Sequence, residues 1–295
     1  MSLKAVLRQL VPRSTRNWVR SPSKTIHWGW NEIQYRLGHT VKIELRPGWP
    51  LMCHPASYRM AYSAQVCDPD QISEFDSFVA HCRSGMVLFD IGAHFGIFSL
   101  AALHFGGSSA RAVAVDPSPR ALRMLKRQAA INGCADRLTI IQAAAGDESG
   151  ELAMVPAGVN GSEYFLLPQD HTAGEFTHVK ELTIDELVHI TGLIPTHIKI
   201  DVEGFEAKVL KGGKHALSQS TPLLFLELHN QMVSEQNGNP QETLDLLGEF
   251  GYEILTMQGQ PVCSQEIHKH ALLRCIGRYS SRHLDHNELV SNRPK

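Results

Sequence analysis

The sequence has no cysteines in the Cys-x-x-Cys spacing, although six cysteines are spread along its 295 residues. Their spacing matches neither a zinc site nor a small disulfide-rich scaffold, so we expect reduced thiols in a cytoplasmic protein. No stretch reaches the roughly 18 consecutive apolar residues that span a bilayer, and the N-terminus lacks the apolar segment of a secretory signal. The formal net charge is only -2, so no overall basic field favours nucleic acid as a partner.

The first thirty residues depart from this charge balance, because all their charged side chains are basic: Lys4, Arg8, Arg13, Arg16, Arg20 and Lys24. Apolar residues recur among them at helical spacing, which predicts a basic amphipathic helix. Three interpretations stay open. The helix packs on the main domain as a solvated element, it lies peripherally on the anionic inner membrane surface, or it is an Arg-rich transit peptide.

Histidine is frequent, with sixteen residues, but these are scattered along the chain. Two close pairs occur near the C-terminus, at His268 and His270 and at His283 and His286. Neither pair has an evident third ligand, and metal sites with protein ligands use three or more. We therefore expect both pairs to be solvated loop residues, and we assign no metal to them.

Short apolar runs alternate with amphipathic stretches from residue 86 onward. We expect strands at 86–91, 111–116, 137–144, 196–201, 223–229, 252–257 and 272–277. Helices are expected between them, and one at 72–82 precedes them. This alternation predicts an α/β fold with a mostly parallel sheet. We expect a small strand-and-turn region at 40–66, a main domain at 71–280, a tail at 281–295 and a largely irregular segment at 145–182.

The ends of the five central strands mark the expected binding site. In open parallel sheets, ligands bind beyond the carboxyl ends of the strands. The residues at these ends are Asp90, Asp116, Ala144, Asp201 and His229. Four of these side chains can donate or accept protons, so the sequence predicts a polar site along this edge.

A glycine turn follows the first strand, with Gly92 and Gly96 four residues apart. Glycines at such a turn permit positive φ and close approach of the backbone to a ligand, although they could simply make a tight turn. The dinucleotide fingerprint needs a further glycine, and the Asp90 carboxylate would repel a pyrophosphate. Asp116 lies where such folds hold ribose hydroxyls, although it could also be a turn residue. Together they favour an adenosine ligand that carries cationic groups, S-adenosyl-L-methionine.

Several segments resemble the FkbM family of S-adenosylmethionine-dependent methyltransferases. They are FDIGAHFGIFSL (89–100), AVAVDPSPRALRMLKRQAAING (112–133), AAAGDESGEL (143–152), IKIDVEGFEAKVLKGG (198–213) and LLFLELH (223–229). The resemblance implies a Rossmann-like class I methyltransferase fold, with a seven-stranded, mostly parallel sheet and helices on both faces. It also implies methyl transfer to a hydroxyl group of a sugar, a glycoconjugate or a natural product.

The resemblance also assigns cofactor-binding residues. Those expected to contact S-adenosyl-L-methionine are Asp90, Gly92 and Gly96 at the methionine part, Asp116 at the ribose, and Ala144 and Ala145 at the adenine, together with Ala93 and His94 of the glycine turn. Glu74 is a weaker candidate for the same region. The family usually has asparagine at the position of His94 and an aliphatic residue at the position of Phe95.

The candidate catalytic residues are Asp201, Glu203 and His229. An alcohol acceptor must lose its proton as the new bond forms, and a carboxylate or a histidine can take it. Two assignments stay open. His229 is the general base while Asp201 or Glu203 orients the acceptor, or the three side chains hold a divalent metal. Each also has a structural interpretation, and Lys199 is expected in a structural ion pair.

The absence of a [DN]PPY motif after the fourth strand argues against methylation of nucleic-acid bases. We therefore expect a small-molecule or glycan acceptor. Two rival functions remain: a nicotinamide-dependent oxidoreductase, disfavoured by the missing glycine, and a binding protein that retains the fold without catalysis.

Overall fold

The computed structural model describes residues 30, 33–34, 37–157, 163–166, 176–235, 239–262 and 272–277. Three predictions fall outside these residues: the N-terminal basic helix, except for Trp30 at its end, the tail at 281–295, and both histidine pairs. The hypothesis of membrane contact through residues 1–30 therefore stays a prediction. None of the described helices combines the length and apolarity needed to cross a membrane.

A seven-stranded sheet forms the centre of the molecule, in the order β12-β13-β11-β10-β3-β4-β5. Its strands are β3 (Val87–Ile91), β4 (Arg111–Asp116), β5 (Leu138–Gln142), β10 (His197–Ile200), β11 (Leu223–Glu227), β12 (Tyr252–Leu255) and β13 (Leu272–Gly277). The five strands from β5 to β11 are parallel to one another. Only β13 runs antiparallel to its neighbours β11 and β12. The predicted strands and the predicted mostly parallel arrangement are confirmed.

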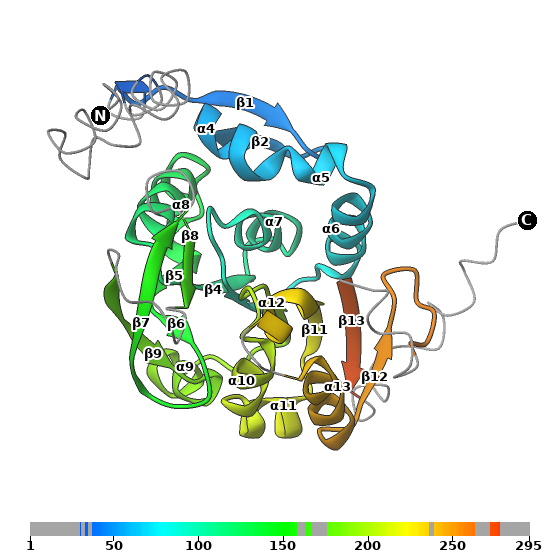
Figure 1. Ribbon diagram of the computed structural model, residues 1–295. Helices are drawn as coiled ribbons and strands as arrows, with labels where there is room; N and C mark the ends of the chain where they lie inside the picture. Colours follow the sequence, from blue (N-terminus) through cyan, green and yellow to red (C-terminus); the bar gives the residue numbers. More distant parts are fainter. Residues whose placement is uncertain are drawn as a thin grey trace, which may run out of the picture.

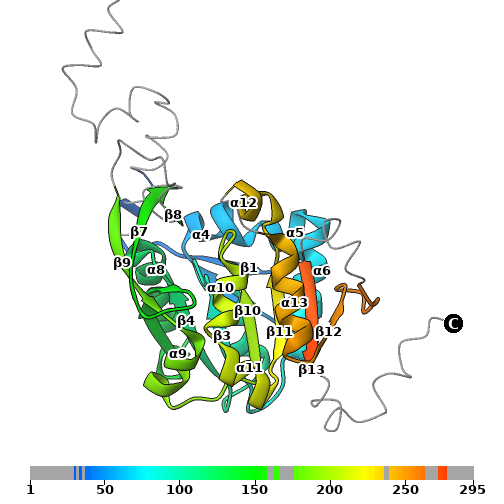
Figure 2. The same cartoon turned by 60° about the horizontal axis from the view of Figure 1, so that its bottom comes forward.

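Helices cover both faces of this sheet, as Figures 1 and 2 show. One face packs against α6 (Pro69–His81), α7 (Ile97–Phe105) and α8 (Pro119–Ile131), and the other against α9 (Ile184–Thr191), α10 (Glu206–Lys211), α11 (Lys214–Ser220) and α13 (Pro240–Glu249). Side chains of β3 alternate between the two cores, with Leu88 in one and Phe89 in the other. This two-sided burial explains why the strands read as continuous apolar runs.

Capping side chains fix where several helices begin. Ser118 accepts a hydrogen bond from the Ala121 N–H at the start of α8, and Asn239 accepts one from the Gln241 N–H at the start of α13. In both helices a proline follows the cap, at a position where no intrahelical N–H bond is lost. Ser118 and Asn239 therefore fix the starts of α8 and α13.

The segment at 145–182 is more ordered than expected. It contributes to a four-stranded sheet, β6-β9-β7-β8, formed by β6 (Ala144–Ala145), β7 (Gly150–Ala157), β8 (Glu163–Leu166) and β9 (Thr177–Leu182). The antiparallel pairing of β7 with both β8 and β9 supplies the order. Figure 1 shows this sheet at the side of the central sheet that carries β5.

The region at 40–66 contains the expected strands, but half of it is helical. β1 (Val41–Glu44) and β2 (Pro50–Cys53) form a hairpin, and α4 (Pro55–Ser57), η2 (Tyr58–Tyr62) and α5 (Ala64–Cys67) follow. Leu51 and Tyr62 belong to the same core cluster as Leu88 and Phe98. This region therefore packs directly on the main domain.

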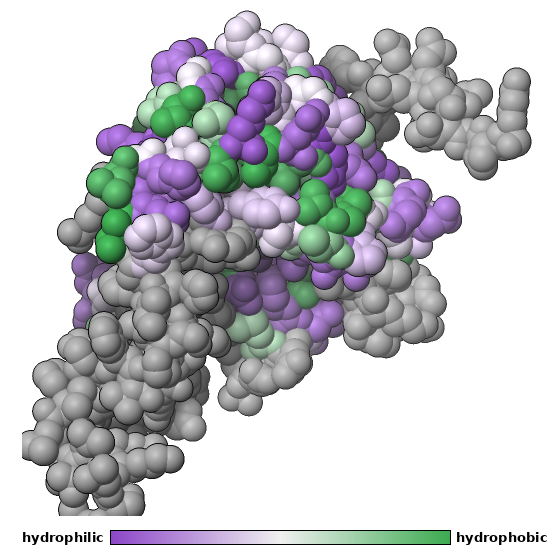
Figure 3. Space-filling view, turned by 90° about the horizontal axis from the view of Figure 1, so that it is seen from above, coloured by the Kyte–Doolittle hydropathy of each residue, from purple (hydrophilic) through white to green (hydrophobic). Residues whose placement is uncertain are grey.

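Large apolar side chains on the surface occur in small groups. Figure 3 shows the face that carries β1 and α5, where apolar residues alternate with hydrophilic ones. Trp30, Ile33 and Leu37 are among the exposed apolar side chains and follow helical spacing. Scattered exposed apolar residues of this kind are normal for protein surfaces.

Candidate active site

A cavity of about 510 Å³ opens beyond the carboxyl ends of the central strands. Its volume lies in the range of small-molecule binding sites. Eleven of the predicted site residues line the cavity: Asp90, Gly92, Ala93, His94, Gly96, Asp116, Ala144, Ala145, Asp201, Glu203 and His229. Of the site residues predicted from the sequence, only the weaker candidate Glu74 does not line it. The expected juxtaposition of strand ends is thus present, although the role of each residue stays a proposal.

The two glycines of the turn are required by contacts within the protein. Gly92 has φ +80°, and a Cβ atom built there would lie 1.7 Å from the carbonyl oxygen of Asp201. Gly96, with φ +72°, precedes α7, and its Cβ would lie 2.2 Å from Cδ1 of Leu125. Both glycines therefore permit close packing: the turn lies against the end of β10 at Gly92 and against α8 at Gly96.

His94 occupies a left-handed backbone position with φ 47°. Asparagine and histidine are both enriched in this region among non-glycine residues, which explains how histidine replaces the usual asparagine. The ring stacks on Phe95 with centroids 3.9 Å apart, and its buried Nε2 has no hydrogen-bond partner. Burial lowers the pKa of His94 to about 4, so the ring is neutral at physiological pH.

The two aspartates at the ends of β3 and β4 are both held by hydrogen bonds. Oδ2 of Asp116 accepts from the backbone N–H of His94 at 2.8 Å, and Oδ1 accepts from that of Ser118 at 2.7 Å. Asp90 Oδ2 accepts from both the N–H and the hydroxyl of Ser99, at 3.0 and 2.6 Å. Burial raises the pKa of both carboxyl groups, that of Asp116 to about 7.

Four residues of the four-stranded sheet line the cavity with apolar side chains. Ala144 and Ala145 form β6 and are buried. Leu152 and Met154 of β7 line the same cavity. These two residues were missed because the segment was expected to be irregular, yet their alternate positions along a strand place both on one face.

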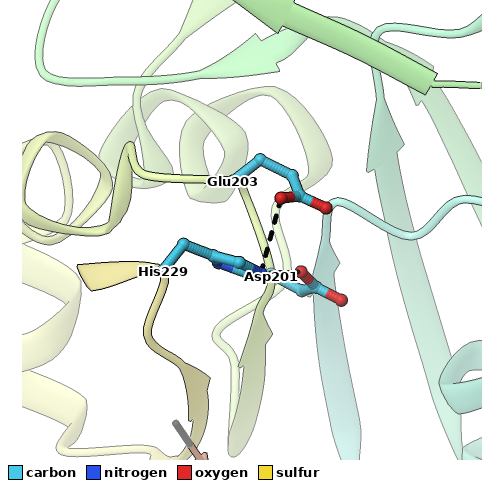
Figure 4. Close-up of side chains that lie close together, drawn as sticks. All are labelled: Asp201, Glu203 and His229. Carbon is cyan, nitrogen blue, oxygen red and sulfur yellow. Dashed lines mark ion pairs between the residues drawn. The ribbon is translucent and has the colours of Figure 1, made fainter. Parts of the chain in front are cut away.

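His229 lies at the centre of a group of carboxylates, part of which Figure 4 shows. Its Nδ1 atom lies 2.8 Å from Oε1 of the fully buried Glu206. Its Nε2 atom faces Glu203 Oε2 at 3.5 Å and Asp201 Oδ1 at 3.8 Å. Burial alone would lower the pKa of His229, but the hydrogen bond with Glu206 and the nearby acidic charges raise it. The candidate catalytic residues are therefore in contact, and Glu206 is an additional member.

A buried ion pair lies beneath this group. Lys199 Nζ lies 2.9 Å from Glu74 Oε1 and 3.5 Å from Glu227 Oε2. The Lys199 and Glu74 side chains are only 2% and 0% exposed. Burial alone would lower the pKa of Lys199, but attraction to the nearby carboxylates raises it. This agrees with a structural role for Lys199 and places the weaker candidate Glu74 in a buried ion pair.

Residues of η2, α5 and α6 also line the cavity. Tyr62, Gln65 and Gln71 line the cavity. The Tyr62 hydroxyl donates to the carbonyl of Phe95 at 2.6 Å and accepts from Gln128 Nε2 at 2.7 Å. These contacts join η2 to the glycine turn and α8. No motif in the sequence pointed to Tyr62, because the contact depends on packing between distant segments.

The family comparison identifies the class of protein to which this fold and site belong. The methyltransferase FkbM domain family matches residues 90–254, more than half of the chain. The chain belongs to this family. This confirms the resemblance seen in the sequence and the Rossmann-like methyltransferase fold, with S-adenosyl-L-methionine as the cofactor.

Solved structures add three comparisons. A methyltransferase FkbM from Methylobacillus flagellatus KT is 20% identical, with a TM-score of 0.44; the match covers 65% of this chain and 43% of that one. The chain thus spans less than half the length of that structure. A precorrin-6y methyltransferase from Geobacter metallireducens is 12% identical over 70% of this chain and 86% of that one, with a TM-score of 0.39. The tRNA methyltransferase TrmK of B. subtilis is 15% identical over 69% and 65%, with a TM-score of 0.38. No curated protein matches the chain.

Proposed function

We propose that this protein transfers a methyl group from S-adenosyl-L-methionine to the oxygen of a hydroxyl group on a small molecule or glycan. One observation carries the proposal. A single cavity joins the residues expected to bind the cofactor with the Asp201, Glu203 and His229 cluster. This cluster contains more carboxylates than its imidazole can neutralise, so it can accept the proton of an alcohol.

The residues present fit an adenosine-bearing, cationic cofactor. The Asp116 carboxylate is held by two backbone N–H groups and retains acceptor capacity for ribose hydroxyls. Asp90 and the acidic cluster provide negative charge near the glycine turn. The buried, unpartnered Nε2 of His94 offers one further polar contact. Ala144, Ala145 and Met154 line the cavity and would supply apolar contacts to an adenine ring.

The cluster residues would hold the acceptor hydroxyl and take its proton. The bound cofactor supplies an electrophilic methyl group on a positively charged sulfur. Asp201, Glu203 and His229 would orient the acceptor oxygen toward this methyl group and would take up the hydroxyl proton, while the cofactor would leave as S-adenosylhomocysteine. Alignment of the reacting atoms can lower an activation barrier by about 7–11 kcal/mol. Asp201 and His229, which follow β10 and β11, would contribute by holding the acceptor in line with the methyl group.

The preference for a small-molecule or glycan acceptor rests on the family resemblance and on charge. The cavity lining includes Asp68, Asp201, Glu203 and Glu227. This acidic lining is opposite to the basic surface that binds nucleic-acid phosphates. β7 and the segment around Tyr62 line the cavity, so we propose that they select the acceptor.

Titration calorimetry with S-adenosylhomocysteine, and with NAD as a control, tests the cofactor. We expect micromolar binding of S-adenosylhomocysteine and none of NAD; the opposite result would favour the oxidoreductase. A panel of sugar and glycoconjugate alcohols with isotope-labelled S-adenosyl-L-methionine then tests turnover. Cofactor binding without turnover on any acceptor, unchanged by Asp201→Asn, would favour the non-catalytic binding protein.

Binding of S-adenosylhomocysteine should weaken at acidic pH because Asp116 must be ionised to accept from the ribose hydroxyls. Burial raises the pKa of Asp116 to about 7. A ligand that prefers the ionised carboxylate lowers the pKa of Asp116. The affinity for S-adenosylhomocysteine is therefore highest at a pH above the pKa of the free protein. Below that pKa the affinity falls by about tenfold per pH unit. Calorimetry between about pH 5.5 and 8 measures this. Asp116→Asn should bind weakly with no such slope, and an identical slope in both proteins would contradict the assignment.

A further inference from the structure

The atoms of Asp201, Glu203 and His229 that face one another are spaced like the ligands of one cation. One ligand atom from each side chain lies within 4.8 Å of the other two. His229 Nε2 lies 3.5 Å from Glu203 Oε2 and 3.8 Å from Asp201 Oδ1. Metal–ligand bonds of about 2.1 Å separate neighbouring ligand atoms by about 3.0–3.4 Å. Small side-chain movements would therefore bring the three atoms into a coordination sphere.

The orientation of His229 is the second observation. Its Nδ1 is bonded to Glu206 Oε1 at 2.8 Å, which leaves Nε2 directed at Asp201 and Glu203. Glu206 is fully buried, and its second oxygen has no partner. A carboxylate that holds the far nitrogen of a ligating histidine is a recurrent arrangement at protein metal sites, where it fixes the ring and its tautomer.

Three carboxylate groups lie close to the imidazole of His229. Asp201, Glu203 and Glu206 lie around one imidazole, while Lys199 is already paired with Glu74 and Glu227. Partly buried carboxylates need opposite charge or strong hydrogen bonds. A divalent cation would supply more compensating charge than a single imidazolium can.

We propose that Asp201, Glu203 and His229 bind one divalent cation of the Mg²⁺ and Mn²⁺ class, which polarises the acceptor hydroxyl. Two carboxylates and one imidazole leave coordination positions open for water and for the acceptor oxygen. Polarisation by the cation would lower the pKa of the hydroxyl group. The inference rests on the proposed methyl transfer, because it names how the same cavity holds its acceptor.

Metal binding itself is the test, with Mn²⁺ as the probe. Calorimetry and the loss of the free Mn²⁺ paramagnetic resonance signal are measured on metal-free protein with saturating S-adenosylhomocysteine. We expect one Mn²⁺ per chain with a dissociation constant below about 100 μM. Glu203→Gln and Asp201→Asn should each weaken binding at least tenfold. Glu249→Gln, on the exposed side of α13, is the matched control and should bind as the wild type does.

The outcome separates this inference from the proposed function. Glu203 is 43% exposed, so its replacement should leave the thermal unfolding temperature unchanged and the result interpretable. No Mn²⁺ binding at 1 mM, or equal binding by Glu203→Gln and the wild type, would overturn the metal site. S-adenosylhomocysteine binding and labelled methyl transfer in EDTA report on the proposed function independently. Full turnover in EDTA would also overturn the role of the cation while leaving the methyltransferase intact.

Discussion

Replacing Lys199 with methionine should destabilise the protein by about 3–5 kcal/mol, because it leaves Glu74 as an unpaired buried carboxylate. The two groups lie 2.9 Å apart with side chains that are 2% and 0% exposed. Water cannot compensate for the missing cation at such a position. Urea unfolding followed by circular dichroism measures the change in the free energy of unfolding.

A second substitution distinguishes the lost pair from lost packing. Lys199→Met combined with Glu74→Met removes both charges, and most of the stability should return because the apolar side chains are similar in volume. Lys211→Met is the matched control. Lys211 pairs with Glu242 at 2.6 Å, but the side chains are 41% and 42% exposed, so the loss should stay below about 1 kcal/mol. A double variant as unstable as Lys199→Met alone would show that packing, not charge, is responsible.

The central sheet could be predicted because its strands are buried on both faces. β3, β4, β10 and β11 each lie within the apolar runs from which they were expected, and their flanking helices begin at recognisable caps. The sheet of β7, β8 and β9 was not predictable in the same way. Its order comes from pairing between segments distant in sequence, such as Leu152 with Val179, and a single-sequence pattern does not encode such register.

The site was predictable where topology alone places residues. The rule that ligands bind at the carboxyl ends of parallel strands brought Asp90, Asp116 and Asp201 to one cavity. Contacts that depend on side-chain packing were not predictable. Glu206 could be seen as a nearby acid, but its bond to His229 Nδ1 requires the turn after β10 to fold back toward β11. The role of Tyr62 depends likewise on how η2 packs against α8.

Gly92 should tolerate no side chain, and Gly92→Ala should cost about 3 kcal/mol or more. Part of this loss is the strain of an alanine at φ +80°, about 1–2 kcal/mol. The rest is a collision, because the new Cβ would lie 1.7 Å from the carbonyl oxygen of Asp201. The Cβ atom is fixed by its bond to the Cα atom, and the oxygen belongs to the backbone, so the clash can be relieved only if β3 and β10 separate at their carboxyl ends. The separation would also displace Asp201, so affinity for S-adenosylhomocysteine should fall with stability.

Gly48→Ala isolates the contribution of the collision. Gly48 has nearly the same conformation, φ +78°, but a Cβ there meets nothing within 4 Å. It should therefore show only the strain of about 1–2 kcal/mol and unchanged binding of S-adenosylhomocysteine. The difference between the two variants in urea unfolding measures the contact between the glycine turn and Asp201. Equal losses of stability in the two variants would mean that the ends of β3 and β10 separate at no cost. The contact between the glycine turn and Asp201 would then not be what positions Asp201.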